Sequence, residues 1–161
     1  MTLRDKLIAF NNPGTGMMSL RIPVWDDPTR KILDDQEFIE AIQDRTVPKG
    51  IKSTLINGSS LAKLGRYFRD AWELSGSRVI INMDKARKIH LDVIRVKRNE
   101  HLAALDIPFI VALEKGDQAL IADISKTKQM LRDIPQTLDL VTNVKTPEDL
   151  QNIWPSNLTQ E

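Results

Sequence analysis

The two histidines are the side chains best suited to bind a metal or to transfer a proton. His90 and His101 are eleven residues apart in one expected helix. Eleven residues are about three turns, so both side chains fall on nearly one face, but roughly 16 Å apart along the axis. That distance is too long for one shared ion, and Asp92 and Glu100 do not complete a ligand set. We interpret both histidines as half-exposed polar positions and predict no metal and no cofactor.

Nucleophiles and phosphate loops lack the surrounding residues that they need. Ser59 and Ser60 are not in a G-x-S-x-G frame, and the chain has no cysteine. Gly14 and Gly16 form a G-x-G, but neither a third glycine nor a Gly-Lys-Ser/Thr follows. These glycines therefore predict a plain loop.

Two acidic pairs occur where local structure commonly uses aspartate. Asp26-Asp27 precedes Pro28 in an expected turn, and Asp34-Asp35 begins an expected helix. Neither pair has a feature that indicates acid–base chemistry. We predict that the protein is not an enzyme.

Composition is that of an ordinary globular chain. Hydrophobic residues make up 41% of 161 residues, aromatic residues 5%, and the formal net charge is +1. A core with so few aromatic residues favours helix-rich packing, and the near-neutral balance argues against a nucleic-acid-binding domain. No run of apolar residues is long enough to predict a membrane span, and Met1 to Phe10 lacks the apolar region of a secretory signal.

The fold class that we predict is α+β, beginning with a small mixed α/β unit over residues 1–81. Strands are expected at 19–25, 51–56 and 79–81, the first of them at a sheet edge because of Pro23. A helix should begin at Asp34, where Glu37 completes a capping box. The expectation for the residues before the 11–16 loop is a short helix or an arm. Residues 67–74 should be helical or irregular, with inward-facing side chains at Phe68, Ala71 and Trp72.

An antiparallel helical hairpin is expected over residues 82–134, followed by a tail over 135–161 with a short helix at 147–154. Asn82 can cap the first helix, and Pro108 should kink the helix or restart it. Gly116 should form the tight turn. Two helices alone cannot bury both apolar stripes, so the hairpin should dock on the first unit or pair with other copies.

Two sets of side chains are candidates for binding. The interface candidates are Trp25, Ile89, Val93, Phe109, Leu113, Ile121 and Ile124. A basic stripe that could contact phosphates comprises Lys85, Arg87, Lys88, Arg95, Lys97 and Arg98. The stripe lacks aromatic stacking groups, so we expect a solvated helix face or pairing with acids on another chain instead.

Several segments between residues 47 and 155 follow motifs of a known group. They are Val47-Pro48-Lys49-Gly50, Phe68-Arg69-Asp70-Ala71-Trp72, Asp84 to His90, Leu102 to Asp117, Lys128 to Asp133, and Thr146-Pro147-Glu148-Asp149-Leu150 with Trp154-Pro155. This series resembles small proteins of tailed bacteriophages that are tail-fibre-associated or uncharacterised. The corresponding motifs are "VPxG…FRDAW" and "DKAKEIH…LAALDxxFMRALExGD…KQxLRD…TPEEL".

The resemblance implies a structural, protein-binding component of the virion tail, made in the host cytoplasm and homo-oligomeric. Its partners would be other tail proteins or the tail fibre. It implies no catalytic residues. Two alternatives stay open: a tail-fibre assembly chaperone that is not retained in the virion, and a small nucleic-acid-binding protein that uses the basic stripe.

Overall fold

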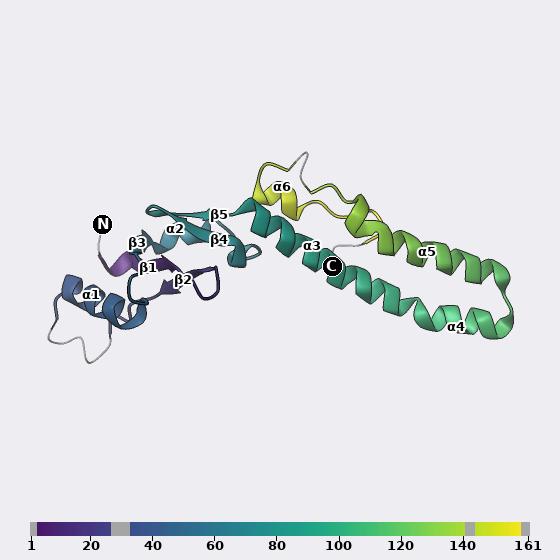
Figure 1. Ribbon diagram of the computed structural model, residues 1–161, viewed down its shortest axis with the longest axis horizontal. Helices are drawn as coiled ribbons and strands as arrows, with labels where there is room; N and C mark the ends of the chain where they lie inside the picture. Colours follow the sequence, from purple (N-terminus) through teal and green to yellow (C-terminus); the bar gives the residue numbers. More distant parts are fainter. Residues whose placement is uncertain (1–2, 27–32, 141–143, 159–161) are drawn as a thin grey trace. The chain divides into compact units, whose positions relative to one another are not determined.

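The structure is a computed structural model that describes residues 3–26, 33–140 and 144–158. The chain divides into two compact units, Met1–Lys85 and Ala86–Glu161. The first unit has two small antiparallel sheets and short helices, and the second is helical (Figure 1). The predicted α+β class is confirmed. Each unit is described by itself below.

A three-stranded antiparallel sheet in the order β2-β1-β3 organises the first unit. The strands are β1 (Lys6–Asn11), β2 (Met18–Arg21) and β3 (Ser53–Asn57), preceded by the 3-10 turn η1 (Leu3–Asp5). The expectation of a helix or an arm before the 11–16 loop is wrong for residues 6–11, which form the central strand. Its continuous run Ile8-Ala9-Phe10 is buried, and a short apolar run of this kind does not distinguish a buried strand from a helix.

Helix α1 (Asp35–Thr46) packs on this sheet. Asp34 accepts hydrogen bonds from the backbone of Gln36 and Glu37, and Glu37 bonds back to the Asp34 N–H at 3.1 Å. The predicted capping box is therefore confirmed. The helix buries Phe38, Ile39 and Ile42 against Ile8 in one cluster.

The edge strand β2 ends earlier than predicted. Its position at the sheet edge agrees with the prediction, but the strand stops at Arg21 instead of continuing to Trp25. Ile22 and Val24 are 71% and 65% exposed. The β1–β2 pairing ends at Ile8 and Arg21, although β1 continues to Lys6 and pairs there with β3.

The remainder of the first unit is a β-hairpin preceded by short helical turns. Helix α2 (Gly58–Ala62) and the 3-10 turn η3 (Arg69–Ala71) lead into β4 (Trp72–Ser75) and β5 (Arg78–Ile81). The expectation of helical or irregular structure over 67–74 is correct at η3 but wrong from Trp72 onward. The inward packing of Phe68, Ala71 and Trp72 is confirmed, since they are 2%, 0% and 6% exposed.

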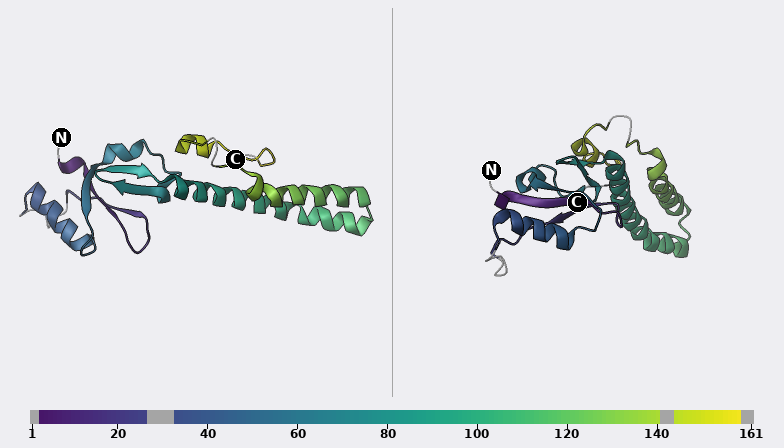
Figure 2. Two further views of the ribbon diagram at one scale, coloured as in Figure 1. Left: turned by 45° about the horizontal axis from the view of Figure 1, so that its top comes forward. Right: turned by 60° about the vertical axis from the view of Figure 1, so that its left-hand side comes forward.

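The second unit is built from long helices. Helix α3 (Met83–Ala104) and helix α4 (Asp106–Lys115) are separated by Leu105, so Pro108 lies in the first turn of a restarted helix. Helix α5 (Gln118–Thr137) returns antiparallel beside α4 (Figure 2). The short helix α6 (Pro147–Gln151) is three residues shorter than the predicted 147–154 helix. None of the helices over the described ranges is long and apolar enough to cross a membrane.

The C-terminal segment completes the core of this unit. Leu158 is buried in one cluster with Ile94 of α3 and with Leu131 and Ile134 of α5, and Trp154 packs against them. Helix α5 continues past the expected end at residue 134 to Thr137, through Pro135.

Gly116 makes the α4–α5 turn possible. It has a φ of +66°, and the next residue, Asp117, accepts a hydrogen bond from the Leu120 N–H at 3.0 Å. A Cβ at Gly116 would meet nothing within 4 Å, so only the backbone conformation opposes substitution. We expect Gly116→Val to lower the free energy of unfolding by about 1 kcal/mol or more in urea titrations. Gly116→Asn should lose clearly less, because asparagine tolerates this conformation, and equal losses would contradict this account.

Candidate protein-binding surface

The tip of the α4–α5 hairpin exposes a concentration of large apolar side chains. Ile107 is 73% exposed, and Ile110 and Leu113 are each 52% exposed. Val111 and Leu120 are 38% and 42% exposed. We call these five residues the tip surface. They lie within fourteen positions of one another, from α4 to the first turn of α5.

The sequence of α4 explains this exposure. Asp106–Lys115 reads DIPFIVALEK, which places apolar side chains on every side of the helix instead of in one stripe. At about 100° per residue, the side chains of Ile110 and Ala112 point in directions roughly 160° apart, so they lie on nearly opposite sides of the helix. Only Ala112 is buried, and the main packing neighbour of α4 is α5. A helix that is apolar all round is normally covered on all sides, so among the described residues of the second unit the tip surface lacks a neighbour.

Lys128 of α5 joins the two helices at the start of α4. Its ammonium lies 2.7 Å from an Asp106 carboxylate oxygen and 4.8 Å from the centre of the Phe109 ring. The Lys128 side chain is only 12% exposed. This ion pair and cation–π contact hold the start of α4 against α5, and therefore fix which face of α4 points outward.

Of the seven interface candidates, only Leu113 is mainly exposed. Ile124 is 5% exposed and is therefore a core residue. Trp25 is half-buried, packs on the cluster around Ile8, and has its ring 5.6 Å from that of Phe38. The other four are half-buried, namely Ile89, Val93, Phe109 and Ile121. The structure thus brings together Phe109, Leu113 and Ile121 near the hairpin tip, but not Trp25, Ile89 or Val93.

Sequence reasoning missed Ile107, Ile110 and Val111. Phe109 and Leu113 are the interface candidates that the sequence predicts on α4, but Phe109 lies under Lys128. The available signal was the absence of any polar face between Ile107 and Leu113. Such a run requires partners on two sides, whereas a hairpin supplies one.

The predicted basic stripe does not form a single surface. Its residues are distributed around most of the circumference of α3 when about 100° is assigned to each residue. Five of the six bind groups within the chain: Lys85 to Glu73, Arg87 to the Leu140 carbonyl, Arg95 to Asp92, Lys97 to Glu100, and Arg98 to the Asn99 side chain. These contacts favour structural roles over phosphate binding.

His90 differs most from its predicted environment. It is 0% exposed, so the interpretation as a half-exposed position is wrong. It shares a buried stripe with Ala86 and Ile94, each four residues away. Its Nε2 lies 2.7 Å from the Ile153 carbonyl and donates to it, and its ring stands edge-on to Trp154 with 5.6 Å between centroids. Burial lowers the pKa of His90 below its usual 6.5, and the hydrogen bond to Ile153 opposes that change.

This position makes His90 a structural residue that connects α3 to the C-terminal segment. His101, the other histidine, is half-buried on the same helix. Within the described residues, no group of three or more histidine, aspartate or glutamate side chains is arranged to hold a metal ion.

Comparison of the chain with models of protein families, with curated proteins and with solved structures finds no match.

Proposed function

We propose that this protein is a structural component of the tail of a tailed bacteriophage and acts by binding proteins through the tip surface. The observation that supports binding most directly is the exposure of Ile107, Ile110 and Leu113 on one hairpin. Large exposed apolar patches on a protein surface commonly mark interaction sites. The motifs between residues 47 and 155 support the assignment to a phage tail.

The occupant that we propose for the tip surface is a second copy of the same chain. Two-fold pairing places one patch against the same patch of the other copy. If two α4 helices pair antiparallel about their middle, Ile110 and Val111 of the two copies meet at the centre. Two hairpins joined in this way form a four-helix arrangement, in which each helix gains the neighbours that one hairpin lacks.

Analytical ultracentrifugation over a range of concentrations tests the self-association. The expected species has at least twice the 18.3 kDa chain mass and dissociates on dilution. A single monomeric species at every concentration would overturn the proposed occupant.

Mass spectrometry of gradient-purified particles tests the role in the tail. We expect this chain in the particles at a fixed ratio to the major tail proteins. If the chain is abundant in infected lysate but absent from particles, the proposed virion component is refuted and the assembly chaperone takes its place.

A further inference from the structure

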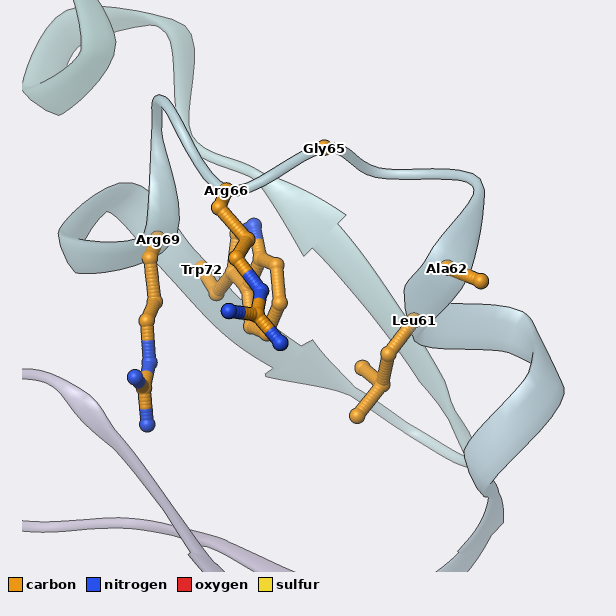
Figure 3. A pocket seen from close by; sticks show the side chains of 6 residues that line it. All are labelled: Leu61, Ala62, Gly65, Arg66, Arg69 and Trp72. Carbon is orange, nitrogen blue, oxygen red and sulfur yellow. The ribbon is translucent and has the colours of Figure 1, made fainter.

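A pocket of about 510 Å³ lies beside β4 in the first unit, away from every residue of the tip surface in sequence. It is lined by Leu61, Ala62, Gly65, Arg66, Arg69 and Trp72 (Figure 3). In this view Arg66, Arg69 and Trp72 stand on one side, and Leu61 and Ala62 stand on the other. The volume is in the range of small-molecule sites, about 300 to 1,000 Å³.

The polar side chains of this pocket are donors that lack acceptors. Arg66 and Arg69 are exposed, and neither guanidinium has an ion pair or a hydrogen bond among the described residues. Trp72 is 6% exposed, and its Nε1 has no hydrogen-bond partner in the described part of the chain. A buried indole N–H without a partner is uncommon and costs stability. None of the lining residues is acidic, so the pocket has an excess of donors.

We propose that this pocket binds an organic carboxylate. A carboxylate has only acceptors and matches the planar fork of arginine, so it supplies what Arg66 and Arg69 lack. Leu61, Ala62 and the indole of Trp72 offer contact to an apolar body. Inorganic phosphate would satisfy the arginines but would leave this apolar side in contact with water.

A neighbouring hollow shows why the anion should prefer this pocket. The second hollow, of about 320 Å³, shares Arg69 and Trp72 but also includes Asp70. A carboxylate bound there would be repelled by the like charge of Asp70. Its Arg21 also already donates to the Leu20 carbonyl at 3.0 Å and lies over the Phe10 ring. The larger pocket therefore offers two arginines, Arg66 and Arg69, and no acidic lining residue.

The indole N–H of Trp72 provides a local readout for the test. The full-length ¹⁵N-labelled chain is titrated with 3-phenylpropionate while the indole signals are followed by NMR. A Trp72→Phe variant and sequential assignment identify the signal independently. We expect a saturable shift of the Trp72 signal with the acid and a much smaller one with the neutral analogue 3-phenylpropanol. The double variant Arg66→Gln with Arg69→Gln should weaken binding about tenfold or more.

The matched control is Arg78→Gln, which removes an exposed arginine from β5 of the same unit and should bind like the parent. The proposal is overturned if the acid produces no saturable shift, if the alcohol binds equally well, or if the double arginine variant binds unchanged.

A further pair of titrations identifies the source of the carboxylate. A short peptide that ends in phenylalanine with a free carboxylate is compared with its amidated form. Tighter binding of the free peptide than of 3-phenylpropionate indicates a protein C-terminus, and the reverse order indicates a small acid.

A chain with Ile107→Glu and Ile110→Glu should bind 3-phenylpropionate normally, so this pocket and the tip surface are tested separately.

Discussion

A chain with Ile107→Glu and Ile110→Glu is expected to be monomeric at concentrations where the parent chain associates. Each substitution removes an apolar contact and places a carboxylate in the pairing face. Burial of one such side chain contributes about 1.5 to 3 kcal/mol, so we expect two changes to raise the dissociation constant about 100-fold or more. Analytical ultracentrifugation of both chains measures this change.

The same double variant should fold normally. Ile107 and Ile110 are 73% and 52% exposed, so little native packing is lost. Glutamate is also a good helix former, and Ile107 lies in the first turn of α4, where a negative charge is favourable. The free energy of unfolding of the monomer should therefore change by about 0.5 kcal/mol or less.

Ile22→Glu is the matched control for this experiment. Ile22 is 71% exposed, close to the value for Ile107, but it belongs to the first unit. This change should leave association unaltered. Equal loss of association in Ile22→Glu, or full association of the double variant, contradicts the tip surface as the binding face.

Replacement of His90 by alanine is expected to lower the free energy of unfolding by about 3 kcal/mol. The change leaves a cavity between α3 and Trp154 and removes the donor to the Ile153 carbonyl. Large-to-small changes at buried sites commonly cost about 2 to 5 kcal/mol, and the lost hydrogen bond to the Ile153 carbonyl adds to this cost. Urea unfolding at about pH 8 measures the loss, since His90 is then neutral in both states. His101→Ala, at a half-buried position, should cost much less.

His90 should also make stability depend on pH. The pKa of His90 in the folded chain is below 6.5, the value expected when it is unfolded. Between these two values the unfolded chain binds a proton that the folded chain does not. The contribution of neutral His90 to the free energy of unfolding is therefore complete above about pH 6.5, and it decreases as the pH falls toward the pKa of His90 in the folded chain.

Replacement of His90 by phenylalanine isolates this effect. The free energy of unfolding of the parent chain should fall from about pH 7 to about pH 5 more steeply than that of His90→Phe. Any change of the free energy of unfolding with pH that the carboxylates cause is common to the parent chain and His90→Phe. His101→Gln should retain the parent slope, and an unchanged slope in His90→Phe would show that His90 does not cause it.

The sequence by itself determined the features that depend on neighbouring residues. The capping box of Asp34 and Glu37, the Asn82 cap, the restart at Pro108 and the left-handed turn at Gly116 all appear as predicted. Each depends on backbone groups within about four positions, or on the allowed φ of one residue. The α+β class followed from the same local signals together with the period of the apolar residues.

Only the tertiary structure decided which faces of these elements are covered. Residues 6–11 became a central strand because β2 and β3 pair on both sides of them. On α3 the buried stripe is Ala86, His90 and Ile94, one position from the stripe inferred from Ile89 and Val93, because the segment containing Ile153 and Trp154 returns from more than sixty positions away. Periodicity gives the angle between side chains on a helix, but not which angle meets a neighbour. The exposure of Ile107 and the unpaired indole N–H of Trp72 have the same cause, since each depends on whether a segment distant in sequence covers that group.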